Sequence, residues 1–192
     1  MAGSARYTAI LDACVLYPAP LRDLLLSLAQ AGLYHARWSD EIHDEWTRNL
    51  LLDRPDLTPD QLARTRELMN GSIPDSVVSN YGALVDRLSL PDPDDRHVLA
   101  AAIAGHADAI VTFNLKDFPR GTLHAYNIEP QHPDDFVLNQ LELSEIAALS
   151  AIRRMRARLR NPPKTALELI DRLSLCGLPQ TAARLRQAQE LI

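Results

Sequence analysis

The chain has 192 residues, of which 46% are hydrophobic, and this is enough for one compact domain with an appendage. Its net charge of −5 argues against a nucleic-acid coat protein, and no apolar run approaches the roughly 20 residues that cross a membrane. Met1–Arg6 lack the apolar region of a secretion signal, and Cys14 and Cys176 lie far apart without metal-like spacing. We therefore expect a cytoplasmic protein with reduced thiols and no membrane contact.

Strand and helix signals alternate over the first 142 residues, which favours a parallel sheet with helices on both faces. Short apolar runs predict strands at Tyr7–Leu11, Tyr34–Arg37, Val77–Val78, Ala109–Phe113 and Asn127–Glu129. Helical spacing and capping residues predict helices over Leu21–Ala31, Ser39–Leu51, Thr58–Gly71, Ala83–Leu88, Asp95–Ala104 and Asp134–Leu141. The expected fold class is therefore α/β.

The last 50 residues differ in character, because they contain helix signals and no strand signal. Ser144–Arg160 is amphipathic, and Pro162 and Pro163 interrupt the pattern. Thr165 opens a second helix with a capping box, and Pro179 opens the last one. We expect a main domain at 1–142 and a helical extension at 143–192, which is too small to be stable without docking on the main body or a partner.

Positive charge is concentrated in this extension. Six cations follow one another without an intervening acid: Arg153, Arg154, Arg156, Arg158, Arg160 and Lys164. Because the whole chain carries −5, the remainder carries −11. Such a segment is typical of a solvated helix face, and equally of a surface that binds a phosphate backbone or an acidic partner. The candidate RNA contacts are Arg153, Arg154, Arg156 and Arg158.

Acidic residues recur where an α/β fold builds a site. Asp12 follows the first strand, at the carboxyl edge of the sheet, where it is a ligand or an ordinary turn or cap residue before the next helix. If Ile42 and Trp46 are buried, helical phase places Glu45 beside them and Asp44 on the opposite face. A carboxylate beside a buried stripe needs a partner or a metal ion, unless its head group reaches solvent.

A second acidic group lies around the next helix and strand. Asp92, Asp94 and Asp95 precede an apolar helix; N-capping explains one of them, and like charges this close usually require a cation or a proton. Asn114 and Asp117 follow the strand after that helix, where turn chemistry is the alternative explanation. Oxygen ligands from separate elements suit Mg²⁺ or Mn²⁺, which neutralise a phosphate and activate water.

Four blocks of residues together resemble a known family. They are Asp12 after an apolar strand, Ser39 to Glu45, Asp95 to Ala102, and Thr112 to Pro119. In these blocks the chain resembles the PIN-domain nucleases, in the branch that contains the VapC-type toxins of type II toxin–antitoxin systems. The resemblance covers about Tyr7 to Leu141, and the tail from Ser144 resembles the helical extension of some members.

The resemblance implies a three-layer PIN-like fold with a parallel five-stranded sheet and Mg²⁺- or Mn²⁺-dependent cleavage of RNA by an endoribonuclease. It also implies a toxin with a small antitoxin partner and a homodimer. Where the family usually carries an aspartate two residues after the strand-end threonine, this chain has Asn114, so either Asp117 substitutes or the site holds fewer metal ions. The expected catalytic residues are Asp12, Glu45, Asp95, Asn114 and Asp117, and the expected metal ligands are Asp12, Glu45, Asp95 and Asp117.

Two other interpretations of the acids stay open. An acid-rich α/β phosphatase would use Asp12 as its nucleophile, although Cys14 stands where such an enzyme would carry a second acid. A non-catalytic PIN-fold binding module would act through its helical tail, and the neutral Asn114 is consistent with this. His97, in the first turn of the apolar helix, is a candidate phosphate contact or acid–base group, or an ordinary surface residue.

Overall fold

The computed structural model of the chain describes residues 7–192. Within this range a parallel sheet has four strands in the order β2-β1-β3-β4. They are β1 (Thr8–Leu11), β2 (His35–Arg37), β3 (Ala109–Val111) and β4 (Glu129–Gln131). In the register of the sheet, Ala9 of the central strand β1 pairs with Ala36 of β2 and with Ala109 of β3. The α/β class and the parallel sheet are confirmed.

The expected fifth strand is wrong for the described residues. The segment at Val77 forms one isolated parallel bridge with Trp38, beside β2. The N–H of Trp38 donates to the carbonyl of Ser76, and the N–H of Val78 donates to the carbonyl of Trp38. The chain then turns away at Asn80, whose φ of 63° lies in the left-handed region, so the pairing does not extend into a strand.

The helices, in chain order, are α1 (Ala13–Leu16), α2 (Ala19–Gln30), α3 (Asp40–Asp53), α4 (Pro59–Ser72), α5 (Gly82–Val85), the 3₁₀ helix η1 (Pro93–Asp95), α6 (Arg96–Ala104), α7 (Arg120–His124), α8 (Pro133–Leu143), α9 (Glu145–Arg158), α10 (Ala166–Leu175), α11 (Pro179–Arg186) and the 3₁₀ helix η2 (Gln189–Leu191). Ser39, Thr58 and Thr165 accept backbone N–H groups at the starts of α3, α4 and α10, as the sequence predicts. The short helices α1 and α7 were not predicted, because one helical turn is too short to show a period.

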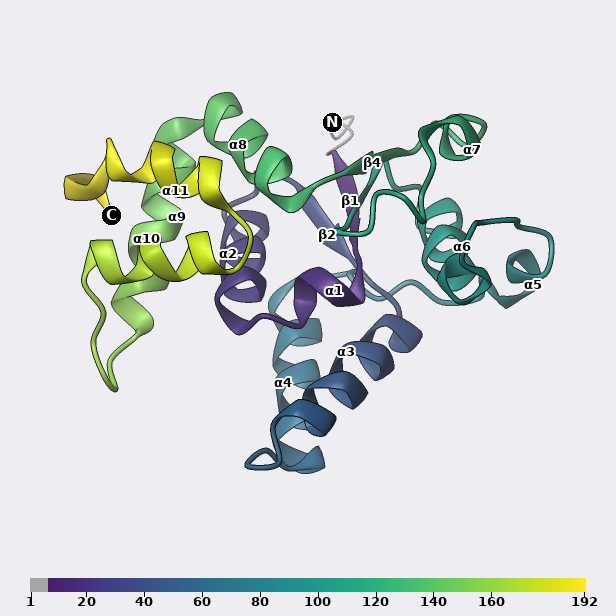
Figure 1. The fold of residues 1–192 in the computed structure, drawn as a ribbon, viewed down its shortest axis with the longest axis horizontal. Coiled ribbons are helices and arrows are strands. Elements are labelled where there is room, and N and C mark those ends of the chain that lie inside the picture. Colours follow the sequence, from purple (N-terminus) through teal and green to yellow (C-terminus); the bar gives the residue numbers. More distant parts are fainter. Residues whose placement is uncertain (1–6) are drawn as a thin grey trace.

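The sheet lies between helices (Figure 1). α6 packs against β1 and β3, whereas α2 packs against β2. Ile10, Ala36 and Ile110 are fully buried at the centres of their strands, which explains why these strands are short apolar runs. α3 and α4 pack against each other and project from this body as a helical hairpin.

The helical extension packs on the main body through α2 and α8. α9 contacts both of these helices, and α11 contacts α8. Asp134 of α8 fixes the joint, because its carboxylate accepts the backbone N–H of Gln180 at 2.9 Å and that of Thr181 at 2.8 Å, in the first turn of α11. Since α8 contacts both parts, the division between residues 142 and 143 stays a prediction.

Within residues 7–192, no helix has both the length and the apolar character that crossing a bilayer requires. The expectation about a secretion signal concerns Met1–Arg6, which lie outside the described residues.

Candidate active site

Asp12 ends β1 and is buried, with 3% of its surface exposed. Its Oδ2 accepts the Thr112 hydroxyl at 2.7 Å and the Cys14 thiol at 3.1 Å, and its Oδ1 accepts the backbone N–H of Ala13 at 2.7 Å. Burial raises the pKa of Asp12 and the nearby Glu45 raises it further, while the hydrogen bonds act in the opposite direction. The end of β1 therefore holds a fixed carboxylate close to a second acid.

The loop after β3 is tied to Asp12 through Thr112. The Thr112 hydroxyl, which donates to Asp12, also accepts the backbone N–H of Asn114 at 2.9 Å. This bond accompanies a turn out of the sheet, so β3 ends before Phe113 and is two residues shorter than predicted. The carbonyl of Asn114 accepts the N–H of Asp117 at 2.9 Å, and this turn brings both side chains to the same cleft.

α3 brings Glu45 to the same place. The Ser39 side chain accepts the N–H of Ile42 at 3.2 Å and fixes the start of the helix. Ile42 and Trp46 are fully buried, Glu45 is half-buried beside them, and Asp44 is exposed. The phase of the helix therefore gives Glu45 the position that the sequence predicts.

Asp95 lies where η1 passes into α6, and it is half-buried. It makes no capping hydrogen bond to α6, whereas Asp92 caps η1 by accepting the N–H of Asp94 at 2.9 Å. Capping therefore explains one of the three neighbouring aspartates, as expected. Burial raises the pKa of Asp95 to about 7, and the charges of Asp12, Asp92, Asp117 and Glu45 add to the shift.

His97 lies between two glutamates of α3, and its side chain is 14% exposed. Its Nε2 is 3.5 Å from Oε2 of Glu45, and its Nδ1 is 3.7 Å from Oε2 of Glu41. Burial alone would lower the pKa of His97, but Glu45 and Glu41 raise it above its usual value. The interpretation as an ordinary surface residue is wrong. The one signal for this contact is the spacing of Glu41 and Glu45, which share one face of α3 one turn apart.

These side chains surround one cleft of about 550 Å³. Its lining residues come from α3, from η1 and the start of α6, and from the loop after β3: Glu41, Asp44, Glu45, Arg48, Asn49, Asp92, Asp94, Asp95, His97, Asn114 and Asp117. Asp12 is not part of the lining, although it is close enough to raise the pKa of Asp95. The structure therefore brings together all five predicted catalytic residues, with Asp12 below the surface. Sequence reasoning did not find Glu41 and Arg48, and it placed Asp44 on the opposite face of the helix, whereas Asp44 also lines the cleft.

The donor chemistry of this cleft fits a hard divalent cation. Asp12, Glu45, Asp95 and Asp117 offer only oxygen atoms, and their mutual repulsion is what a bound cation would relieve. Across the part of the chain that the structure describes, no three aspartate, glutamate, histidine or cysteine side chains lie close enough together to hold a metal ion. The acids therefore surround a potential site without converging on one point.

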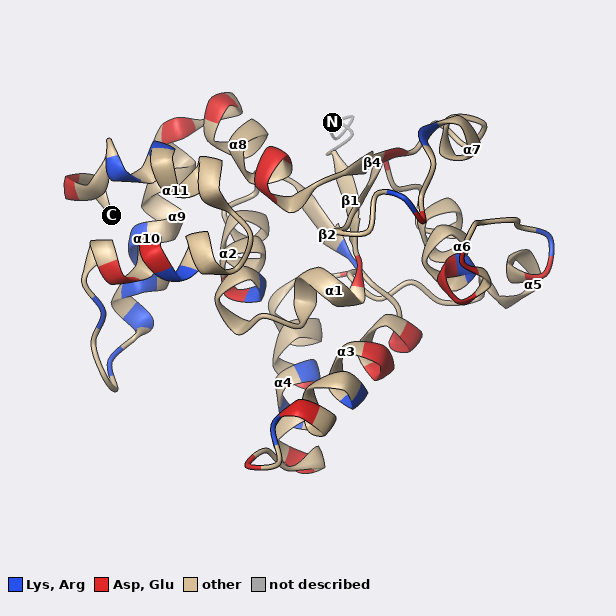
Figure 2. Ribbon diagram, in the orientation of Figure 1, with Lys and Arg blue, Asp and Glu red and all other residues tan. Residues whose placement is uncertain are grey.

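The predicted RNA-binding arginines of α9 lie away from this cleft (Figure 2). Arg153 and Arg154 are exposed, and their side chains make no hydrogen bond or ion pair with any described residue. Arg156 donates to the carbonyl of Lys164 at 3.0 Å, and Arg158 donates to the Ser27 hydroxyl at 2.8 Å. The first two are therefore free to meet a ligand, while the other two also connect parts of the fold.

Comparison with known proteins agrees with this geometry. Residues 8–116 match the PIN domain family, and residues 133–187 match the VapC50 C-terminal domain. The chain is 47% identical over 93 residues to "Putative ribonuclease VapC50" of Mycobacterium tuberculosis, and the aligned part covers 48% of this chain and 54% of that protein. The chain thus spans about half the length of the curated relative it matches. No solved structure matches it.

The family match extends over more than half of the chain and includes the end of β1, α3, the start of α6 and the beginning of the loop after β3. These are the elements that supply the acidic cleft and Asp12. The helical extension matches a domain described from a VapC protein. On these grounds the chain belongs to the PIN-domain family.

Proposed function

We propose that this protein is an Mg²⁺- or Mn²⁺-dependent endoribonuclease that hydrolyses RNA phosphodiester bonds in the cleft. The observation that carries the proposal is the clustering of acids from four separate elements around one cleft at the carboxyl edge of the sheet: Asp12, Glu45, Asp95 and Asp117. Structural carboxylates are usually paired with cations or backbone donors, whereas here the charge of Glu45 helps to raise the pKa of Asp12, and the charges of Asp12, Glu45 and Asp117 help to raise the pKa of Asp95.

The residues that would hold a divalent ion are Asp12, Glu45, Asp95 and Asp117, with Asn114 as a neutral oxygen donor at the rim. Such an ion neutralises phosphate charge and lowers the pKa of water. Thr112 and Cys14 act as positioning residues, because their hydrogen bonds fix the orientation of the Asp12 carboxylate. Burial raises the pKa of the Cys14 thiol, so Cys14 remains a protonated donor to Asp12.

His97 and Arg48 supply the positive charge that an RNA backbone needs near these acids. His97 holds Glu45 from the side of α6, at 3.5 Å between Nε2 and Oε2. Arg48 lines the cleft and is exposed, and its guanidinium has no hydrogen bond or ion pair with another described residue. We assign Arg48 a contact with an RNA phosphate, because a guanidinium binds phosphate oxygens through two parallel hydrogen bonds. Arg153 and Arg154 are proposed to contact a more distant part of the RNA.

A biological role as the toxin of a toxin–antitoxin pair in the cytoplasm is part of the same proposal. It is supported by the match of α8–α11 to the VapC50 C-terminal domain and by the likeness to a protein named as a VapC ribonuclease. A small antitoxin protein and a second copy of the chain are the proposed partners.

The two alternative functions have less support. A phosphatase with Asp12 as its nucleophile would need that carboxylate at the cleft surface, whereas it is buried and accepts three hydrogen bonds. A non-catalytic binding module is favoured by Asn114 alone, because a neutral amide stands where the family usually has a carboxylate. Metal binding and RNA cleavage separate this alternative from the proposed nuclease.

The direct test is cleavage of a labelled single-stranded RNA by the full chain, with Mg²⁺ or Mn²⁺ and with EDTA. We expect cleavage that EDTA stops and that Glu45→Gln lowers by about 100-fold or more. Glu67→Gln is the matched control, because Glu67 is an exposed glutamate on α4 outside the cleft. Cleavage that resists EDTA, or that is the same in both variants, would reject the proposed site.

A further inference from the structure

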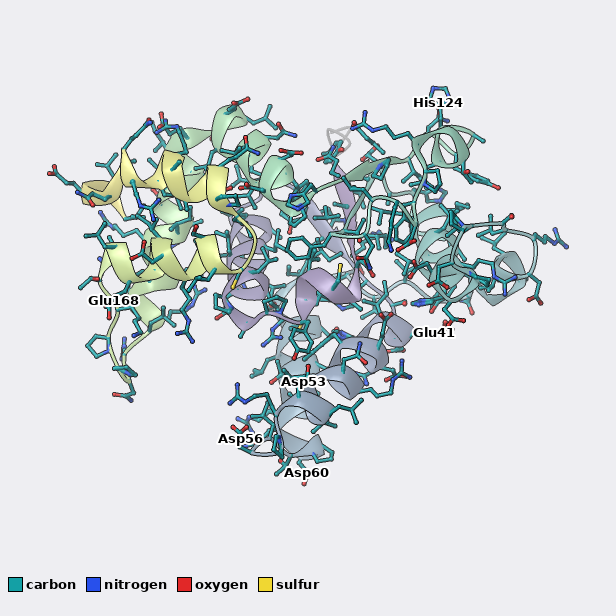
Figure 3. All side chains as sticks on the ribbon, in the orientation of Figure 1. Glu41, Asp53, Asp56, Asp60, His124 and Glu168 are labelled. Atoms are coloured by element: carbon teal, nitrogen blue, oxygen red, sulfur yellow. The ribbon has the colours of Figure 1, made fainter. Side chains whose placement is uncertain are left out.

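A second hollow, of about 590 Å³, lies between the start of α2 and the helical extension. Its apolar lining comes from Ala19 and Pro20 of α2, Met155 and Leu159 at the end of α9, and Leu169 of α10. It is far from the acidic cleft: Figure 3 labels Glu168, which lines this hollow, on one side of the molecule and Glu41, which lines the cleft, on the other.

Four cations line the same hollow: Arg158, Arg160, Lys164 and Arg172. Two acids face them, and both have other contacts. Glu168 accepts the N–H of Thr165 at 2.8 Å in the capping box of α10 and pairs with Lys164 at 3.5 Å, and Asp23 is next to Arg158, so these acids engage Lys164 and Arg158. The side chains of Arg160 and Arg172 are exposed, and their guanidinium groups make no hydrogen bond or ion pair within residues 7–192. The rim therefore has two guanidinium groups available for an external anion.

The hollow continues across α2. A smaller one of about 320 Å³ also has Asp23 and Arg158 in its lining, so the two adjoin at these residues. Its other lining residues include Leu26 of α2 and Leu68 of α4, and Leu68 is 64% exposed. The two hollows form one groove, called the α2 groove below, which runs from α10 across α2 to α4.

We propose that the α2 groove binds an acidic peptide segment of a protein partner. Aliphatic side chains of the segment would enter the apolar lining, and its carboxylates would pair with Arg160 and Arg172 through bidentate hydrogen bonds. An RNA strand fits less well, because no aromatic ring lines either hollow to stack with its bases. This surface is separate from the cleft of the proposed function, so each proposal can fail without the other.

Fluorescence anisotropy on the full chain tests the proposal with a synthetic peptide of about twelve residues that alternates leucine with aspartate. A matched peptide carries lysine in place of aspartate. We expect the acidic peptide to bind with a micromolar Kd and the lysine peptide to bind at least about tenfold more weakly. Circular dichroism verifies that each variant is folded.

Three double variants show whether the contact is local. Arg160→Glu with Arg172→Glu should weaken the acidic peptide by about tenfold or more, and Arg160→Lys with Arg172→Lys should retain most of the binding. Arg153→Glu with Arg154→Glu is the matched control, because it changes the charge equally on exposed residues outside the groove. RNA cleavage should be unchanged in the groove variant.

Any one of four results would overturn the proposal. The first is that the acidic peptide fails to bind. The second is that it binds the groove variant and the control variant with the same affinity, which indicates non-specific charge attraction. An RNA oligonucleotide in EDTA displaces the peptide and itself loses affinity in the groove variant, which makes the groove a nucleic-acid surface. Self-association of the wild-type chain is lost in the groove variant, which assigns the groove to a second copy.

Discussion

Asp12 and Asp134 are both buried aspartates, with 3% and 1% of their surfaces exposed, yet the charges around their carboxylates differ. Asp134 accepts two backbone N–H groups at the start of α11, where the helix also presents its positive end. Asp12 lies near Glu45 and Asp95, and burial together with the Glu45 charge raises its pKa. Asp12 also accepts the N–H of Ala13 as the N-cap of the four-residue helix α1, but none of its three hydrogen-bond donors is a charged side chain.

Asp134 is therefore a carboxylate that stabilises the fold, whereas Asp12 is held in place although the nearby acids repel it. The neighbours of Asp134 compensate its burial, and its contacts connect the helical extension to the main body. Asp12 forms no ion pair with a described residue, although its charge helps to raise the pKa of His97, and a divalent ion would supply a positive charge beside it. The predictions below test this division.

The largest expected effect is on activity. Asp12→Asn keeps the shape of the side chain and removes its charge, so we expect RNA cleavage to fall by about 100-fold or more. The free energy of unfolding should stay within about 1 kcal/mol of wild type, because hydrogen bonds to the side chain are retained in part and the repulsion with Glu45 is removed. Cleavage assays and urea unfolding on the same samples measure the two effects. A large loss of stability with retained cleavage would reverse the roles assigned to Asp12 and Asp134.

The opposite pattern is expected for Asp134→Ala. The backbone N–H groups of Gln180 and Thr181 lose their acceptor, so the free energy of unfolding should fall by about 3 kcal/mol. Cleavage per folded molecule should change little. Asp135→Ala is the matched control on the same turn, because Asp135 is exposed and its side chain accepts one hydrogen bond among the described residues, from the Gln180 side chain at 3.3 Å. Equal destabilisation by both variants would contradict the capping role of Asp134.

Divalent-ion affinity should depend on pH through Asp95. Its pKa is raised from an ordinary value of 3.8 to about 7, and the ion binds the ionised carboxylate. Affinity for Mn²⁺ should therefore fall by about tenfold for each pH unit below 7 and level off above it. In the metal-free protein, the Asp95 carboxyl stays protonated to a higher pH in the folded state than in the unfolded chain. The contribution of Asp95 to the free energy of unfolding therefore falls as pH rises towards 7.

Calorimetry with Mn²⁺ between pH 5.5 and 8 measures the affinity, and urea unfolding without metal measures the stability. Asp95→Asn should remove this part of both pH dependences, because the amide does not titrate in this range. A wild-type affinity that is flat across this range would contradict the assignment of the titration to Asp95.

The smallest expected effect concerns Arg48. Its loss removes one phosphate contact but no metal ligand, so Arg48→Ala should raise KM for RNA by about tenfold and change kcat little. The slope of log affinity against log salt should decrease by about one unit. Arg64→Ala, on the exposed part of α4, is the control. A drop in kcat at constant KM would place Arg48 in the chemical step instead.

Local sequence rules predicted the parts of the site that depend on one element. The phase of α3 placed Glu45, the capping residues placed the starts of α3, α4 and α10, and the apolar runs placed β1 and β3. The contact of His97 with Glu41 and Glu45 depends on how α6 packs beside α3, and no local pattern contains that information. The same holds for Asp134, which was interpreted as part of a helix start, whereas its partners lie 46 and 47 residues further along the chain.

Some predicted strand boundaries were wrong for a related reason. Asn127 has a φ of 56°, so the last strand begins at Glu129 instead of Asn127. The Thr112–Asn114 hydrogen bond accompanies the early end of β3, and the segment at Val77 forms one bridge instead of a strand. In each case a backbone turn or a tertiary hydrogen bond overrides the propensity of the residues to form a strand.

Calorimetric titration of the EDTA-treated full chain with Mn²⁺ at pH 8 tests the central claim most directly, because it asks whether the acids capture an ion before any RNA is present. We predict saturable binding by the wild type that Glu45→Gln and Asp95→Asn each weaken by about tenfold or more, while Glu67→Gln binds like the wild type. Absence of binding at millimolar Mn²⁺, or equal binding by all four proteins, would contradict the claim that this cleft is a metal-dependent nuclease site.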